Sequence, residues 1–117
     1  MTRMFEYWLE TDLENLPEVK HLGGQVFSQD SNANKIGVEV YYNGEPITLT
    51  GSIKANVIRA DGTTLEVTGE KSGNRAWVIL PAEAYAVPGH IGIYIKRISG
   101  SEISTLGGVE SYVYKTR

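Results

Sequence analysis

The chain has 117 residues, a length that suits one domain able to bury roughly two thirds of the surface that its unfolded form exposes. Its hydrophobic fraction of 41% is ordinary for a globular protein, so stability requires neither a disulfide nor a metal, and the absence of cysteine excludes thiol chemistry. The formal net charge is −3 and the lysines and arginines are scattered, which excludes the basic stripe of a nucleic-acid-binding protein.

The N-terminal residues MTRMFEYWLETD lack the layout of a signal peptide, and no apolar run approaches the ~20 residues that a membrane span needs. We therefore expect a soluble protein that is made in the cytoplasm and binds neither nucleic acid nor membrane.

Apolar residues alternate with polar ones along most of the chain, and turn signals interrupt the alternation at close intervals. This period-two pattern is typical of half-buried strands. Strands are predicted at residues 3–10, 19–27, 36–42, 46–49, 52–59, 63–68, 74–80, 90–98 and 103–114. Pro81 fits the first turn of a helix and Pro88-Gly89 ends it, so one short helical turn is predicted near residues 81–86.

The turn at residues 60–62 indicates the register of its hairpin. A two-residue loop would place Val57 opposite Glu66, whereas a three-residue loop places Val57 opposite Leu65 and puts the apolar residues on one face. We therefore predict the three-residue loop, with Gly62 in the left-handed conformation.

A second turn, Asn43-Gly44, favours the two-residue form. A type I′ turn at these residues pairs Val40 with Ile47 and Val38 with Leu49, so that apolar residues again face one another.

Many short strands without a long amphipathic helix predict a single domain over residues 1–117. The fold class is all-β: a two-sheet antiparallel β-sandwich of immunoglobulin-like architecture, without the Cys…Trp…Cys spacing of antibody domains. Residues 1–18 form the N-terminal strand and its connection, and they are a candidate anchoring segment.

One short segment has the spacing of a calcium loop. Asp30, Asn32 and Asn34 occupy its first, third and fifth positions, but Lys35 and Tyr41 stand where a glycine and a bidentate glutamate are needed. We therefore expect a hydrogen-bonded turn, with no metal and no cofactor.

The residues that could carry catalysis lack the required companions. Neither His21 nor His90 lies in a metal-ligand spacing, and Ser28 and Ser31 lack the signature of an activated nucleophile. A glycosidase pair needs a sugar cleft, so a solvated face better explains the N-terminal carboxylates. These carboxylates are Glu6, Glu10, Asp12 and Glu14. We expect no catalytic residue and no enzyme.

Two predicted strands are apolar on both faces. Trp77 and Ile79 project opposite to Ala76, Val78 and Leu80, and along the last strand Tyr112 and Tyr114 project opposite to Val109 and Val113. A sandwich strand needs only one apolar face, so a loop, the N-terminal segment or another subunit must cover the second. The predicted interface residues are Trp8, Trp77, Ile79, Tyr112 and Tyr114.

The order of several motifs resembles that of known phage proteins. The run SQDSNAN, the alternating Ile36, Val38 and Val40, then NGEPITLTG and IRADGTT, resemble the N-terminal domain of phage baseplate upper proteins. The stretch SGNRAWVILPAEAYAVPGHIGIYIKRISG is similar to small proteins of the phage head fibre family. The resemblance covers about residues 20–114 and departs from the family's pattern at Ala60, where a proline is usual.

This resemblance implies a sandwich that anchors a fibre or adhesion device to the virion, usually as a trimer of its own copies or related chains. Because the chain stops at Arg117 without a coiled coil or a receptor-binding region, we expect a head fibre base or capsid decoration protein, bound to the major capsid protein on the virion exterior. One alternative places the same fold on the tail baseplate, between tail core and receptor-binding proteins. Another is a carbohydrate-binding adhesion module for host surface glycans.

Overall fold

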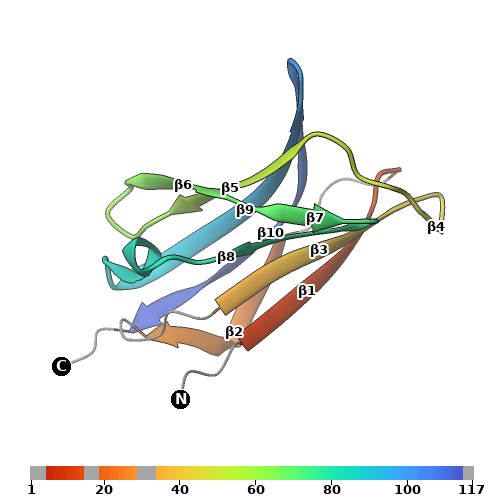
Figure 1. Ribbon diagram of the computed structural model, residues 1–117. Coiled ribbons are helices and arrows are strands. Elements are labelled where there is room, and N and C mark those ends of the chain that lie inside the picture. The colour runs from red at the N-terminus through yellow and green to blue at the C-terminus, as the bar shows by residue number, and fades with distance from the viewer. Residues whose placement is uncertain (1–4, 15–18, 29–33, 115–117) are drawn as a thin grey trace.

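Two five-stranded sheets make up the structure, a computed structural model that describes residues 5–14, 19–28 and 34–114 (Figure 1). The predicted all-β, two-sheet sandwich is confirmed, as is the short helical turn, a 3₁₀ helix η1 (Ala82–Tyr85). The strands are β1 (Phe5–Asp12), β2 (Val19–Ser28), β3 (Asn34–Tyr42), β4 (Glu45–Pro46), β5 (Ser52–Ile58), β6 (Thr64–Thr68), β7 (Glu70–Ser72), β8 (Arg75–Ile79), β9 (Gly89–Ser99) and β10 (Glu102–Tyr114). No helix in the described ranges is long and apolar enough to cross a membrane.

The order of the strands follows the immunoglobulin plan. The first sheet has the order β1-β3-β8-β7, with β4 paired to β3, and the second has the order β2-β10-β9-β5-β6. Strands β3, β8 and β7 therefore occupy the positions of strands B, E and D of an immunoglobulin domain. Strands β10, β9, β5 and β6 occupy those of G, F, C and C′.

Both sheets are mixed, which differs from the expected antiparallel pairing. Strand β1 runs parallel to β3, and β2 runs parallel to β10, while the other pairs are antiparallel. Parallel neighbours need a long connection between them. For β1 and β3 that connection contains β2, which lies in the other sheet, so both N-terminal strands end up at sheet edges (Figure 1).

The core lies between the inner faces of the two sheets. Alternate residues of β3, β5, β8 and β9 point inward and are almost fully buried, and each valine or isoleucine among them contributes about 1.5–3 kcal/mol relative to its exposed state. The inward residues of these strands are Ile36, Val38, Val40, Ile53, Ala55, Val57, Ala76, Val78, Ile91, Ile93 and Ile95. Tyr85 of η1 closes one end of this core, and its hydroxyl oxygen accepts a hydrogen bond of 2.6 Å from the buried amide of Asn34.

The predicted three-residue loop between β5 and β6 is confirmed. Val57 lies opposite Leu65, and the N–H of Arg59 donates to the carbonyl of Thr63 at 2.9 Å. Gly62 has a φ of +87°, in the left-handed region that glycine adopts without strain.

The turn at Asn43-Gly44 is confirmed, but the strand predicted beyond it is wrong. Both turn residues have positive φ, as a type I′ turn requires, and the N–H of Ile47 donates to the carbonyl of Val40. Strand β4 nevertheless ends at Pro46. The place beside Val38 that Leu49 was predicted to fill is occupied by Ala76 of β8, and the N–H of Leu49 donates to the carbonyl of Gly73. Strand β7, which the sequence did not indicate, occupies the resulting sheet edge.

The β9–β10 hairpin projects beyond the rest of the sandwich (Figure 1). Strands β9 and β10 have 11 and 13 residues and turn at Gly100, whose φ is +62°. Strand β5 accompanies β9 only as far as the pair Ser52 and Ile98, and β2 accompanies β10 only from Gly108. We call residues 97–105 the arm.

Candidate functional site

The two tryptophans lie side by side on the outer face of the first sheet. Trp8 of β1 and Trp77 of β8 both occupy positions level with Gly37 of β3, which separates them. Their ring centroids are 6.1 Å apart in an edge-on arrangement, a geometry that aromatic pairs favour. A Cβ atom at Gly37 would collide with the indole of Trp8, so this ring lies directly over the glycine backbone.

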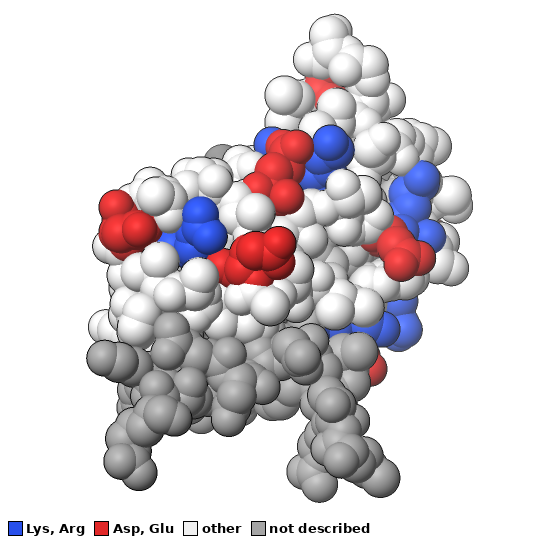
Figure 2. All heavy atoms as spheres, turned by 60° about the vertical axis from the view of Figure 1, so that its left-hand side comes forward, with Lys and Arg blue, Asp and Glu red and all other residues white. Residues whose placement is uncertain are grey.

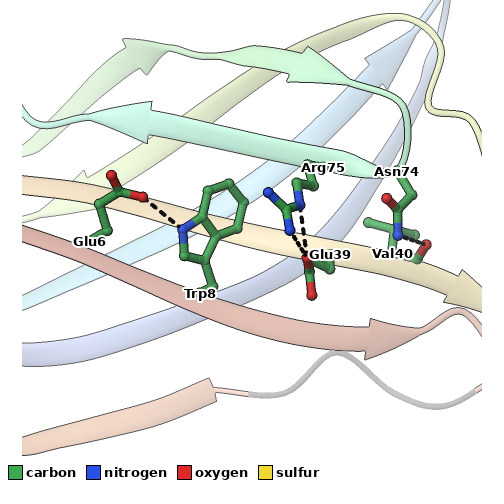
Figure 3. A network of polar contacts seen from close by, with 6 residues as sticks. All are labelled: Glu6, Trp8, Glu39, Val40, Asn74 and Arg75. Carbon is green, nitrogen blue, oxygen red and sulfur yellow. Dashed lines mark hydrogen bonds and ion pairs between the residues drawn. The ribbon is translucent and has the colours of Figure 1, made fainter.

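Charged side chains frame the tryptophan pair, as Figure 3 shows around Trp8. The guanidinium of Arg75 lies 5.2 Å from the Trp8 ring centroid and forms an ion pair of 2.8 Å with Glu39. The indole N–H of Trp8 donates to the carboxylate of Glu6 at 3.0 Å. On the other ring, the ammonium of Lys35 lies 5.3 Å from the Trp77 centroid. Each exposed cation–π contact of this kind contributes about 0.5–1 kcal/mol, so the pair is held in a defined arrangement.

Ile79 extends the same surface. It projects to the outer face two residues after Trp77, and 42% of its side chain is exposed. Trp8, Trp77 and Ile79 together are called the tryptophan surface. The second apolar face of β8 was expected to be covered by a loop, the N-terminal segment or another subunit. The N-terminal strand covers part of it, because Trp8 packs against Trp77. Both indoles remain half-buried.

Tyr112 lies in a different place, on the outer face of the second sheet. Its side chain is 56% exposed, and its ring meets that of His90 edge-on at 5.8 Å. His90 Nε2 is 3.6 Å from the carboxylate of Glu110, which also accepts a hydrogen bond of 2.6 Å from the hydroxyl of Tyr94. This hydrogen bond, together with burial and the negative charge of Glu110, raises the pKa of Tyr94 to about 12.

The predicted interface residues therefore do not form one surface. The tryptophan surface and Tyr112 lie on the outer faces of opposite sheets, separated by the core. Tyr114 ends β10, and its side chain lies outside the described residues. Any partner that contacts both sets has to reach around the sandwich, so the two surfaces have to be treated as separate sites.

The residues of the expected hydrogen-bonded turn are described only in part. Asp30 and Asn32 lie outside the described residues, whereas Asn34 is buried at the start of β3 and bonds Tyr85. Within ranges 5–14, 19–28 and 34–114, no group of three or more histidine, cysteine or acidic residues could hold a metal ion.

One hollow in the part of the chain that the structure describes lies at the end of β1. An open depression of about 410 Å³ is lined by polar residues at the end of β1, including Glu10, Thr11 and Asp12. The carboxylate of Asp12 is bound by backbone N–H groups, so it serves the local fold.

Two features of these surfaces, the contact of Trp8 with Gly37 and the projecting arm, were not predicted from the sequence. The position of Gly37 beneath Trp8 depends on the parallel pairing of β1 with β3, which no local pattern reveals. The projecting arm had a signal, because Ile98 and Ile103 flank the turn SGSE and neither is needed in the core.

Comparison with known proteins gives no relative from which to transfer a role: no protein-family model matches the sequence, and a search of curated proteins finds no match. The interpretation of the surfaces therefore rests on their own chemistry.

Proposed function

We propose that the protein is a structural component of a bacteriophage virion, a head fibre base or decoration protein bound to the capsid exterior as a trimer. Its role is binding and assembly, without catalysis. The observation that carries the binding role is the tryptophan surface, where two half-buried indoles and the exposed Ile79 stand on the outer face of a sheet. The motif order over about residues 20–114 supports the phage assignment.

The composition of the tryptophan surface suits a protein partner. Tryptophan and arginine are enriched in protein interfaces and dominate their binding energy, whereas lysine and glutamate belong to the rim. Trp8, Trp77 and Arg75 form the centre here, with Lys35 and Glu39 around them. Docking a capsid protein would bury the remaining exposed area of the indoles while the charged side chains stay at the wet margin.

A glycan ligand is less well supported by the same geometry. A sugar ring stacks on an aromatic face, but Arg75 lies over Trp8 and Lys35 lies over Trp77. Glu6 also occupies the indole N–H of Trp8. A glycan would have to displace these contacts first, which a flat protein partner packing against the ring edges need not do.

The virion role is tested on purified particles of the phage that carries the gene. Mass spectrometry is expected to find the protein in the particles, and immunogold labelling is expected to decorate the heads. Label at the tail tip would instead support the baseplate, and absence of the protein from the particles would contradict any structural role.

The role of the tryptophan surface is tested with capsids that lack the protein. We expect Trp77→Ala to weaken binding of the added protein to such capsids roughly 10- to 100-fold, as loss of a central interface tryptophan does. Ile79→Ala is expected to weaken the binding as well, and Ile58→Ala is its matched control, since Ile58 is exposed to the same extent as Ile79 but lies on the other sheet. Equal losses with Ile79→Ala and Ile58→Ala would place the binding surface elsewhere.

A further inference from the structure

The turn between β3 and β4 contains the only asparagine of the chain that precedes a glycine, Asn43-Gly44. An asparagine in this context can modify itself, because the backbone nitrogen of the following residue attacks the Cγ atom of the side-chain amide and closes a succinimide ring. Glycine favours the attack, since it has no side chain to shield its nitrogen and lets the backbone rotate freely. Asn43 is therefore the asparagine with the highest intrinsic reactivity in the chain.

Solvent reaches this turn freely. Asn43 and Gly44 are both exposed, and a Cβ atom at Gly44 would meet nothing within 4 Å. The adjoining strand β4 has two residues, so few strand hydrogen bonds hold the turn in place. Neither burial nor a long hairpin therefore protects the peptide bond between the two residues.

A carboxylate from another strand binds the turn instead. Oδ1 of Asp12 accepts a hydrogen bond from the N–H of Asn43 at 2.9 Å, and Oδ2 accepts one from the N–H of Gly44 at 2.8 Å. Other carboxylates of the surface meet cations: Glu66 lies 3.3 Å from Lys54. Acidic and basic side chains intermingle in the same way over the face that Figure 2 shows. Asp12 differs, because its two oxygens bind two consecutive backbone donors.

These two hydrogen bonds oppose both requirements of succinimide formation. The attacking nitrogen of Gly44 has to lose its proton, and the negative charge of the carboxylate that accepts this N–H disfavours a second negative charge beside it. The nitrogen also has to turn toward Cγ of Asn43, by rotation about the Cα–C bond of Asn43. Because the two N–H groups are bound by the two oxygens of one carboxylate, this rotation breaks at least one of the bonds. The turn has to leave Asp12 before it can react.

We infer that Asn43-Gly44 is a site of spontaneous covalent modification and that the Asp12 carboxylate holds the reaction back in the folded protein. Once the turn leaves the carboxylate, the nitrogen of Gly44 forms a bond to Cγ of Asn43, and the side-chain nitrogen departs as ammonia with the proton that Gly44 has lost. Water then opens the succinimide at either of its carbonyl groups and gives aspartate or isoaspartate. In sum, an amide and water give a carboxylic acid and ammonia, without an enzyme, an oxidant or a cofactor.

Neither product restores the original turn. An aspartate at position 43 adds a carboxylate to the residue whose N–H Asp12 binds, and like charges repel. An isoaspartate adds a methylene group to the backbone, which a two-residue type I′ turn does not accommodate. The modification therefore loosens the link between the end of β1 and the β3–β4 turn irreversibly. The inference goes beyond the virion role proposed above and does not depend on it.

Mass spectrometry of the peptide that contains residue 43 measures the reaction, because the exchange of NH₂ for OH changes its mass. The purified variants are incubated at neutral pH, at a temperature at which each stays folded. We expect Asp12→Ala to accelerate the reaction roughly 10- to 100-fold, as loss of hydrogen bonds to a charged group allows. Asp12→Asn keeps one acceptor oxygen, and its rate is expected to fall between those of the parent and Asp12→Ala. The parent unfolded in urea is expected to react faster than the folded parent.

Ile93→Val is the control for a general loss of stability, since Ile93 is buried in the core and the change leaves the turn untouched. Its folded form is expected to react at the parent's rate. An unchanged rate in Asp12→Ala, or equal acceleration in Asp12→Ala and Ile93→Val, would overturn the inference. Hydrogen exchange gives a reading on the parent alone: the N–H of Gly44 is expected to exchange at least about tenfold more slowly than in the unfolded chain. Exchange at the unfolded rate would overturn the inference even if Asp12→Ala did not fold.

Discussion

On the outer face of each sheet, an aromatic ring packs directly against the backbone of glycine residues. Trp8 lies over Gly37, and the ring of Tyr94 lies over Gly92 and Gly108, where a Cβ would collide with it. A glycine in a strand weakens the strand because it offers nothing to pack. Here the neighbouring ring supplies the packing, so the glycine and the aromatic residue have to be considered as one unit.

This coupling predicts that the effect of Gly37→Ala changes sign with its neighbour. In the parent chain the new methyl group displaces Trp8 from Trp77 and Arg75, and we expect a loss of about 1 kcal/mol of unfolding free energy. In a Trp8→Ala background the ring that the new methyl group strikes is gone, and we expect a gain of about 0.5–1 kcal/mol, because alanine restricts the unfolded chain more than glycine does.

Urea unfolding of the four proteins measures both values. If Gly37→Ala has the same effect in both backgrounds, the indole does not rest on the glycine.

At the scale of elements, one carboxylate joins the end of β1 to the β3–β4 turn. Asp12 accepts hydrogen bonds from the N–H groups of Glu14 at 3.0 Å, Asn43 at 2.9 Å and Gly44 at 2.8 Å. The bonds from Glu14, Gly44 and Asn43 lower the pKa of Asp12 because they stabilise its ionised form. Three backbone donors from two chain segments thus converge on one exposed side chain.

The lowered pKa gives a pH dependence with a definite sign. The contribution of Asp12 to stability is fully present above its unfolded pKa of about 3.9, and it is lost as the pH falls through the lower folded value. We therefore expect Asp12→Asn to lower the melting temperature at neutral pH, with a difference from the parent that shrinks below about pH 4.

Thermal unfolding across the acid range measures this difference. Glu45→Gln, an equal change of charge at an exposed residue of the same turn, serves as the control. A difference that stays constant from neutral to acid pH would contradict the role given to the Asp12 carboxylate.

Individual elements show which features of the fold a local sequence pattern can predict. The loop at Gly62 was predictable because only one register buries Val57 and Leu65 together. The directions of β1 and β2 were not, since the alternation of side chains is the same in parallel and antiparallel strands. The short edge strand β7 has three exposed residues, so it carries no alternation at all.

At the scale of the whole molecule, the immunoglobulin order of strands places the candidate residues on two opposite faces. Trp8 and Trp77 meet because β1 and β8 both flank β3 in the first sheet. Tyr112 belongs to the second sheet, where it contacts His90. The fold therefore brings Trp8 and Trp77 into contact and keeps Tyr112 apart from both.

Double-mutant cycles are expected to reproduce this arrangement. Trp8→Ala and Trp77→Ala should be non-additive in unfolding free energy by about 0.5–1.5 kcal/mol, as edge-on aromatic pairs are. Trp77→Ala and Tyr112→Ala share no contact, so their effects should add within about 0.5 kcal/mol. Coupling between Trp77 and Tyr112 as large as that between the tryptophans would contradict their separation by the core.

The sequence by itself determined the sandwich, most strand positions, the two glycine turns and the residues with a second apolar face, because alternation and turn chemistry act over a few neighbouring residues. Only the tertiary structure decided that Trp8 joins Trp77 while Tyr112 lies on the opposite face, and that the β9–β10 hairpin projects beyond the rest of the sandwich. Contacts of this kind depend on which strands become neighbours and in which direction they run. That choice is made by the burial of the whole core, and no short segment of the chain encodes it.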